Sequence, residues 1–220
     1  MMKMANVSVI ICVRNGEAYL REALDSIYAQ NLSDLETIVI DDGSEDRTAE
    51  IARSHAIRAQ VITRPASGHP ASLNAGLDVA SRDFIAFLDA DDVWPSTRLR
   101  DMVGVFESDP GIEIVCGQIV NTNELLEPKQ PPFTTRQLTC SLVRRHVFAK
   151  VGRFRTDVTH ASSVDWTVRA AVMGIPMKQL DSVVLLRRIH ADNMGVRDVS
   201  RGRQDLLRVV REHRARTRNA

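Results

Sequence analysis

Short apolar runs alternate with amphipathic stretches through the first half of the chain. The run Val7–Val13 predicts a buried strand, and Gly16–Gln30 predicts a helix with its apolar side chains on one face. Further elements follow in the same alternation, with strands expected at Thr37–Ile40, Arg58–Thr63 and Asp83–Leu88 and helices at Thr48–His55 and Ala71–Ala80. This alternation predicts an α/β fold with a mostly parallel central sheet flanked by helices.

The second half of the chain is less regular. The elements expected there are helices at Pro95–Glu107 (with Ser96 as its cap), Arg145–Val151, Ser163–Met173 and Ser200–Arg216, and strands at Ile112–Cys116 and Val183–Ile189. The segment Glu124–Thr135 contains three prolines and is expected to be a loop. Because no internal repeat or low-complexity segment interrupts the chain, we expect a single domain over residues 1–220, in two unequal parts.

The composition is that of an ordinary globular protein. Of the 220 residues, 44% are hydrophobic and 26% are charged, which excludes a disordered or fibrous chain. No segment approaches the roughly 20 apolar residues of a membrane span, and the N-terminus lacks the features of a signal peptide, so we expect a soluble, cytoplasmic protein. The cysteines Cys12, Cys116 and Cys140 form no CxxC pair, so neither a disulfide framework nor a zinc site is indicated.

Charge is unevenly distributed along the chain. The net charge is +1, yet residues 197–220 contain eight arginines against three acidic residues. The near-neutral total gives no reason to expect a nucleic-acid partner. The basic tail is expected to be a solvated helix that covers an apolar surface. The alternative is a peripheral contact between this helix and anionic lipid.

Two acidic clusters follow predicted strands of the first half. Asp41 and Asp42 follow the second strand, and Asp89, Asp91 and Asp92 follow the fourth in the sequence DADD. Ligands of an open parallel sheet bind at the carboxyl ends of its strands, and clustered carboxylates suit Mg²⁺ or Mn²⁺. The alternative is a solvated acidic turn at the start of the next helix. Because the chain lacks both GxxxxGK[ST] and GxGxxG, a phosphate-bearing ligand would be held through a metal ion.

Three segments in the first half of the chain resemble the family 2 glycosyltransferases of the GT-A fold. They read VSVIICVRNGEAYLREALDSIYAQ, IVIDDGSEDRT and GHPASLNAGLDVASRDFIAFLDADD, and together they span Val7–Asp92. Weaker similarities follow in RRHVFAKVGRF, DWTVRAAVMG and RRIHADNMG. The combination of DDGSxD with DADD at this separation is more specific than either motif alone.

The resemblance implies a GT-A fold with three parts. These are a Rossmann-like nucleotide-binding half at residues 1–95, a smaller acceptor half at 96–196 and a basic C-terminal helix at 197–220. It also implies an inverting glycosyltransferase that uses Mn²⁺ or Mg²⁺ and a nucleoside-diphosphate sugar, expected to be a UDP-sugar. The acceptor stays open among a glycan, a lipid-linked glycan, a peptide and a small molecule. A second copy of the chain is one way to complete the acceptor pocket.

The resemblance also assigns roles to individual residues. Asp41 is expected to accept a hydrogen bond from the base, with Asp42 beside it. Asp89 is expected at the ribose, and Asp91 is expected to bind the metal ion together with His190. The other residues expected to line the nucleotide pocket are Val13, Asn15, Glu17 and Ala90.

The chain departs from the family pattern at the catalytic base. Family members carry Glu-Asp shortly before the helix that includes Arg169, and here Ser162 and Ser163 occupy those positions. We expect Asp165, the nearest carboxylate, to be the base, with Asp157 or the absence of a base as alternatives. Without a base the protein would bind the donor and turn nothing over. A sugar nucleotidyltransferase is a further alternative, although the chain lacks the glycine-rich loop expected of one.

Overall fold

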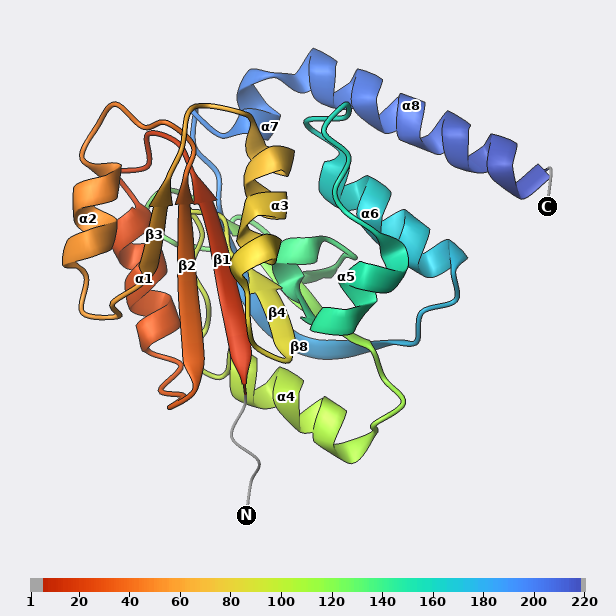
Figure 1. Ribbon diagram of the computed structural model, residues 1–220, viewed down its shortest axis with the longest axis horizontal. Helices are drawn as coiled ribbons and strands as arrows, with labels where there is room; N and C mark the ends of the chain where they lie inside the picture. Colours follow the sequence, from red (N-terminus) through yellow and green to blue (C-terminus); the bar gives the residue numbers. More distant parts are fainter. Residues whose placement is uncertain (1–5, 219–220) are drawn as a thin grey trace.

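A single mixed sheet runs from residue 7 to residue 188 of the computed structural model, which describes residues 6–218 (Figure 1). Seven strands lie in the order β3-β2-β1-β4-β7-β5-β6, and β8 pairs with β5. The strands are β1 (Val7–Val13), β2 (Leu35–Asp41), β3 (Gln60–Thr63), β4 (Phe84–Phe87), β5 (Ile114–Thr122), β6 (Phe133–Thr134), β7 (Ser141–Arg144) and β8 (Met177–Arg188).

The first four strands form the parallel part of the sheet. β1 pairs in parallel with both β2 and β4, and β2 pairs in parallel with β3. The chain therefore moves outward from β1 to β3 and then crosses back to the other side of β1. This reversal makes the carboxyl ends of β1 and β4 a topological switch point, where open α/β sheets bind their ligands. The predicted α/β fold with a parallel core is confirmed.

Helices cover both faces of the sheet because successive side chains of each strand point to opposite sides. Val9 and Ile11 of β1 pack on one face with α1 (Leu20–Tyr28), whereas Ile10 packs on the other face. The first face is also covered by α2 (Thr48–Ser54) and α4 (Arg98–Ser108). The second face is covered by α3 (His69–Val79), α5 (Arg145–Val151) and α6 (Ser162–Val172).

The second half of the sheet departs from the predicted elements. The short strand β7 was not predicted; it follows the 3₁₀ turn η1 (Leu138–Cys140) and pairs antiparallel with both β4 and β5. Strand β8 begins six residues earlier than predicted and pairs with β5 through a shift in register around Gly117. A Cβ at Gly117 would lie 2.3 Å from Val184, so only glycine allows this close approach of the two strands.

Two other expectations for this half are corrected by the structure. The helix expected from Pro95 begins at Arg98, and Thr97 occupies its N-cap without a side-chain hydrogen bond, so Ser96 is not the cap. The segment expected to be a loop contributes Phe133–Thr134 to the sheet as β6.

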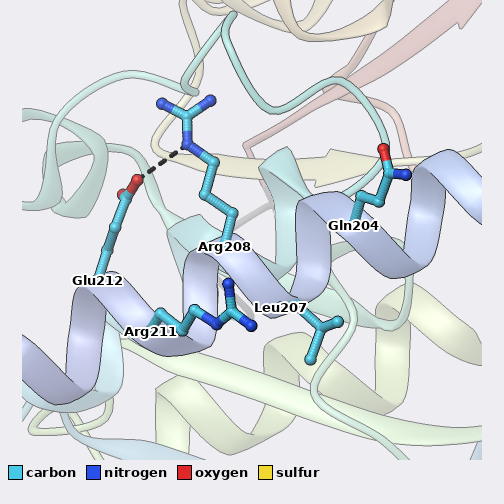
Figure 2. A pocket seen from close by; sticks show the side chains of 5 residues that line it. All are labelled: Gln204, Leu207, Arg208, Arg211 and Glu212. Carbon is cyan, nitrogen blue, oxygen red and sulfur yellow. Dashed lines mark hydrogen bonds and ion pairs between the residues drawn. The ribbon is translucent and has the colours of Figure 1, made fainter.

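The chain ends in α7 (Met194–Arg197) and α8 (Val199–Arg218), which lie across the top of the molecule in Figure 1. Val209 of α8 is buried with Val158 and Ala161, so this helix packs over the segment that leads into α6. A hollow of about 410 Å³ lies along α8, and two of its lining residues, Arg208 and Glu212, form an ion pair (Figure 2). Within the described residues, no helix is both long and apolar enough to span a membrane.

Candidate active site

Three strands end at one edge of the sheet and bring the predicted site residues to it. Val13 at the end of β1 lies opposite Asp41 at the end of β2, and the N–H of Asp42 donates to the carbonyl oxygen of Val13 at 2.8 Å. On the other side of β1, the loop after β4 carries Asp89 and its neighbours. The two acidic clusters predicted from the sequence therefore flank the end of the same strand.

The loop after β2 is held in place by its own acidic side chains. Asp42 is buried and accepts hydrogen bonds from the N–H and hydroxyl of Ser67 at 2.9 Å and from the N–H of Gly68 at 2.8 Å. Burial would raise the pKa of Asp42, but these hydrogen bonds outweigh it and lower the pKa below its ordinary value. Asp42 is thus an ionised carboxylate that ties the end of β2 to the start of α3.

Asp41 and Gly43 shape the tip of this loop. The Oδ1 atom of Asp41 accepts a hydrogen bond from the N–H of Ser44 at 3.0 Å. Gly43 has a φ of +77°, and a Cβ there would lie 2.9 Å from the backbone nitrogen of Ala66. Because that combination favours glycine alone, the DDGS sequence fixes the turn that carries both aspartates.

The loop after β1 packs against the loop after β2. Asn15, with a φ of +54°, accepts a hydrogen bond through Oδ1 from the N–H of Glu45, and its own N–H donates to Ser44 Oγ. Glu17 accepts from the N–H and side chain of Arg47 at 3.1 and 3.3 Å. The structure thus brings Val13, Asn15 and Glu17 to the Asp41–Asp42 loop, where the last two side chains brace that loop.

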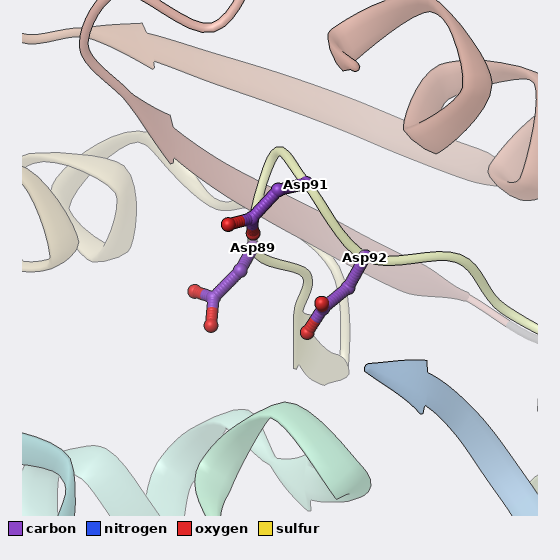
Figure 3. Close-up of side chains that lie close together, drawn as sticks. All are labelled: Asp89, Asp91 and Asp92. Carbon is purple, nitrogen blue, oxygen red and sulfur yellow. The ribbon is translucent and has the colours of Figure 1, made fainter. Parts of the chain in front are cut away.

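Asp89, Asp91 and Asp92 form a compact group of carboxylates (Figure 3). One oxygen of each lies within 4.8 Å of the others, and Figure 3 shows the group beside the end of β8. Burial, together with the charge of Asp91, raises the pKa of Asp89 to about 7. Burial and the charges of the other two also raise the pKa of Asp92 well above its ordinary value. Three acids with this mutual repulsion and hard oxygen donors fit a divalent cation such as Mg²⁺ or Mn²⁺.

His190 completes this group from the distant end of the chain. Its Nε2 atom lies 3.0 Å from Asp91 Oδ2, and the same oxygen accepts a hydrogen bond from Asn193 Nδ2 at 2.8 Å. The imidazole side chain is 9% exposed and lies against the ring of Tyr19, with ring centroids 4.8 Å apart. The pairing of His190 with Asp91 that the resemblance implied is therefore present in the fold, with a nitrogen and an oxygen donor side by side.

Arg188 organises the acidic loop, and the sequence analysis did not single it out. Its backbone N–H donates to Asp92 Oδ1 at 2.9 Å, and its Nε donates to the carbonyl oxygen of Asp91 at 2.9 Å. The guanidinium also binds Glu22 and the backbone of Glu124, and it lies over the ring of Tyr19. Arg188 is 2% exposed, so it fixes the acidic loop from inside the protein.

Asp165, the expected base, lies at the centre of a buried ion-pair cluster. Its side chain has no exposed surface and pairs with Arg169 at 2.8 Å, Arg155 at 3.5 Å and His213 at 3.3 Å. Ser162 is also buried, and Ser163 is half-buried. A carboxylate sealed by three basic side chains is poorly placed to take a proton from an acceptor hydroxyl. These surroundings favour a structural role, and the assignment of Asp165 as base stays a prediction.

Asp157, the alternative base, is half-exposed and paired with two arginines. Its carboxylate binds Arg155 and Arg208 at 2.7 and 2.6 Å. The hydrogen bonds from Arg155 lower the pKa of Asp157 to about 2. A carboxylate with so low a pKa is a weak proton acceptor, so these contacts favour a role in attaching α8.

Comparison with known proteins agrees with this arrangement. The model of the family "Glycosyl transferase family 2" matches residues 8–162, which is most of the chain. An uncharacterized glycosyltransferase of Nostoc sp. is 37% identical over 106 residues, covering 46% of this chain and 33% of that protein. The succinoglycan biosynthesis protein ExoW of Rhizobium meliloti is 42% identical over 103 residues, covering 44% of this chain and 32% of that protein. The aligned part thus spans about a third of these relatives.

Solved structures share the fold at low sequence identity. The mannosyltransferase PcManGT of Pyrobaculum calidifontis, in complex with GDP-Man and Mn²⁺, has a TM-score of 0.74 at 22% identity and covers 96% of this chain and 65% of its own. TarS 1–349 of S. aureus, in complex with UDP-GlcNAc, has a TM-score of 0.74 at 16% identity and covers 88% of this chain and 61% of its own. The fold is that of GT-A glycosyltransferases, and the chain belongs to glycosyl transferase family 2.

Proposed function

We propose that this protein transfers a glycosyl group from a nucleoside-diphosphate sugar, a UDP-sugar in the first instance, to an acceptor hydroxyl with inversion at the anomeric carbon. The observation that carries the proposal is the group of Asp89, Asp91 and Asp92 at the switch point of the sheet, with His190 Nε2 3.0 Å from Asp91. Within the residues that the structure describes, these are the acids grouped closely enough to hold a metal ion.

The residues fit a bound divalent cation on chemical grounds. Asp91 and His190 would hold Mn²⁺ or Mg²⁺, with Asp89 and Asp92 beside them. A bound cation of this kind supplies charge neutralisation for a departing nucleoside diphosphate. Arg188 supports metal binding because it donates hydrogen bonds to the carbonyl oxygen of Asp91 and to the carboxylate of Asp92. The protein itself thus holds the backbone of Asp91 and the carboxylate of Asp92 in place.

The remaining predicted residues suit the nucleoside part of the donor. Asp41 lies across β1 from the metal-binding acids and suits a hydrogen bond to the base, with Asp42 supporting the loop beside it. Asp89 suits a hydrogen bond to the ribose. The loop carrying Asn15 and Glu17 braces the loop after β2 on the other side of the proposed nucleoside site. Ala90 lies beside the loop after β1, because a Cβ at Gly16 would be 3.6 Å from the Cβ of Ala90.

The ligands bound in the similar structures support this donor class. PcManGT is described with GDP-Man and Mn²⁺, and TarS 1–349 with UDP-GlcNAc. Both donors are nucleoside-diphosphate sugars, so this is the class proposed here, while the base and sugar are for experiment to decide.

A thermal-shift experiment tests the proposal. The protein is heated with Mn²⁺ and, in turn, with UDP, GDP, dTDP, CDP and ADP. Since a ligand that binds only the folded state raises its stability, one diphosphate should raise the melting temperature in Mn²⁺ and fail to do so in EDTA. A control variant, Asp109→Asn, changes an exposed aspartate at the end of α4, away from the acidic group. It should respond to the diphosphate like the wild type. No shift with any diphosphate would contradict the proposal.

A second candidate is a donor-binding protein without turnover. Two features favour this candidate. Serines stand at positions 162 and 163, where a carboxylate base is expected, and Asp165 is buried and paired with Arg169. It predicts the same thermal shift without release of nucleoside diphosphate from a bound sugar nucleotide. A sugar nucleotidyltransferase, the third alternative, would instead consume a nucleoside triphosphate and release pyrophosphate.

We further propose that α8 contacts an anionic membrane surface at its exposed side. Leu206, Leu207 and Val210 are each at least 39% exposed there, among the arginines of the same helix. Basic residues near an anionic surface contribute about 1 kcal/mol each. Sedimentation with phosphatidylserine vesicles tests this contact, since binding should weaken as salt rises. If light scattering instead finds a stable dimer that does not sediment with vesicles, the same surface joins two copies of the chain.

A further inference from the structure

Helix α8 presents a second apolar face that does not pack against the protein. Its packed face includes Val209, which is buried with Val158 and Ala161. The other face consists of apolar side chains that are 39–63% exposed, namely Val199, Leu206, Leu207 and Val210. Positions i, i+7, i+8 and i+11 share one side of an α-helix, so these side chains form one stripe. An exposed apolar stripe marks a surface that contacts a protein or a membrane.

The charges beside this stripe are those of arginines. Arg203 and Arg211 are exposed, and they follow Val199 and Leu207 by four residues. Residues four positions apart are neighbours on the helix surface, so both arginines lie beside the stripe. A second copy of the chain, docked through the same stripe in a two-fold contact, would place arginines against arginines. This repulsion disfavours a dimer as the occupant.

The acidic residues of α8 are turned toward the protein. Asp205 accepts a hydrogen bond from the backbone N–H of His160 at 2.9 Å, and Glu212 forms an ion pair with Arg155. The outward side of the helix therefore combines apolar side chains with positive charge. This combination is typical of helices that lie in the plane of an anionic membrane surface.

Helix α7 connects this side of the molecule to the proposed metal site. Asn193 occupies the N-cap of α7, and its Nδ2 atom donates to Asp91 Oδ2 at 2.8 Å. Met194 and Val196, which follow directly, are 40% and 47% exposed. Figure 1 shows α7 and α8 at the end of the molecule toward which β1 and β2 run, where the site lies. The α7–α8 surface thus comprises Met194, Val196, the stripe and its two arginines.

We infer that the acceptor of the proposed transfer is a lipid-linked glycan, held in an anionic membrane on which the α7–α8 surface rests. The inference rests on the proposed function and on the proposed contact of α8. In the step, a hydroxyl oxygen of the glycan forms a bond to the anomeric carbon, and its proton is released to solvent. The bond from that carbon to the phosphate oxygen breaks, and the nucleoside diphosphate leaves with the electron pair. Because enzyme and acceptor share one surface, their effective concentration rises.

Tryptophan quenching tests whether the membrane lies beside the metal site. Met194→Trp is mixed with vesicles of phosphatidylserine that contain bromine-labelled phosphatidylcholine, which quenches tryptophan on contact. The native Trp94 and Trp166 are at most 3% exposed, so the new side chain dominates the response. We expect its emission to be quenched at low salt and to recover as salt rises. The control Tyr28→Trp changes a 60% exposed residue at the end of α1 that leads into β2, and its emission should not be quenched.

Transfer of a labelled sugar tests the class of acceptor. A radiolabelled sugar nucleotide, with the base selected by the thermal-shift experiment, is given to the protein in Mn²⁺. One mixture contains the lipid extract of the cells that make the protein, reconstituted in phosphatidylserine vesicles. The other contains the water-soluble glycans of the same cells. We expect label to enter the chloroform-soluble product of the first mixture and to stay on the donor in the second.

Charge reversal connects the two experiments. The double variant Arg203→Glu/Arg211→Glu replaces two attractions to anionic lipid by repulsions, so vesicle binding and label transfer should both fall by about tenfold or more. Its melting temperature should stay close to that of the wild type, because both side chains are exposed. The matched control Arg100→Glu/Arg145→Glu makes the same change in net charge at exposed residues of α4 and α5, and it should transfer label like the wild type.

Each result supports or overturns the inference. If Met194→Trp is quenched no more than Tyr28→Trp, or if label enters only the water-soluble glycans, the inference is wrong while the proposed function stands. If the protein binds a diphosphate and labels neither extract, the inference is wrong and the donor-binding candidate gains support. A dimer that the double arginine variant disrupts would identify a second copy as the occupant and overturn the inference. If the wild type binds no diphosphate, the proposed function fails first.

Discussion

His190 Nε2 lies 3.0 Å from Asp91 Oδ2, although the two residues are 99 positions apart in the chain. Asn193 donates to the same carboxylate oxygen at 2.8 Å, so a turn after β8 closes onto the loop after β4. The parallel half of the sheet supplies the acids, and the mixed half supplies the imidazole. The proposed metal site therefore exists only when both halves have folded together.

Replacement of His190 by alanine should weaken Mn²⁺ binding without unfolding the protein. The change removes a nitrogen donor, and Asp91 keeps its hydrogen bond from Asn193. We expect a loss of at least about tenfold to a hundredfold in Mn²⁺ affinity, because removal of an outer-shell partner of a metal ligand already costs that much. Competition with a metal-sensitive dye measures it. An unchanged affinity would remove His190 from the proposed ligands.

Replacement of Arg188 by lysine should weaken ligand binding at the same metal site, because Arg188 positions the acidic loop. A lysine cannot reproduce the contacts of the guanidinium with Glu22, the Asp91 carbonyl and the backbone of Glu124. Misplacement of Asp91 should cost about tenfold or more in Mn²⁺-dependent UDP affinity. Calorimetry compares the variant with Arg100→Lys, a change at an exposed arginine of α4, which should bind normally.

Asp165→Asn should act on stability. The variant leaves Arg169, Arg155 and His213 around a neutral side chain, and breaking a buried ion pair in this way costs about 3–5 kcal/mol. Urea unfolding should register this loss, whereas UDP binding by the folded fraction should stay close to wild type. A variant of full stability that has lost turnover would instead support Asp165 as the base.

Acidification should loosen the attachment of α8. The hydrogen bonds from Arg155, together with the charge of Arg208, lower the pKa of Asp157 from 3.8 to about 2 in the folded protein. Because the folded pKa lies below the unfolded one, this contribution to stability is complete above about pH 4 and is lost as the pH falls toward 2. The Asp157→Asn variant lacks the contribution at every pH. The difference between the urea midpoints of the two proteins should be complete at pH 5 and should shrink steadily as the pH is lowered toward 2. Parallel curves over this range would contradict the assignment.

Arg98 should be essential for the attachment of α4 to the mixed half of the sheet. It is fully buried, donates to the carbonyl oxygens of Thr139, Val184 and Ser141 at 2.8–3.1 Å, and lies 4.1 Å from the ring centre of Trp94. Burial lowers its pKa to about 9, so it stays charged at neutral pH. Since Arg98→Met leaves three buried carbonyls without this donor, we expect a loss of at least about 3 kcal/mol in unfolding free energy.

The parallel half of the fold could be predicted because its sequence obeys one simple rule. Each strand from β1 to β4 is a short apolar run, each is followed by a helix or a polar turn, and the acids that follow two of them must meet at one edge. The Asp41–Asp42 and Asp89–Asp92 clusters were therefore predictable from position alone. The Asp-x-Asp spacing and the family resemblance then indicated the metal.

The mixed half could not be predicted in the same way. Strand β7 has only four residues, and it forms because it pairs with β4 and β5, which are distant in the sequence. The first part of β8 contains Lys178 and Asp181 among its apolar residues, which hides the strand pattern. Arg98 and Arg188 look like surface residues in the sequence, because only the tertiary fold shows the carbonyls and acids that surround them.

Isothermal titration calorimetry tests whether the Asp91–His190 pair forms a metal-dependent site for a nucleoside diphosphate. UDP is titrated into the wild type, Asp91→Asn and the control Asp109→Asn, each in Mn²⁺ and in EDTA. We expect UDP to bind the wild type and the control in Mn²⁺ only, and to bind Asp91→Asn under neither condition. Equal UDP affinity in all three proteins, or binding that persists in EDTA, would contradict it.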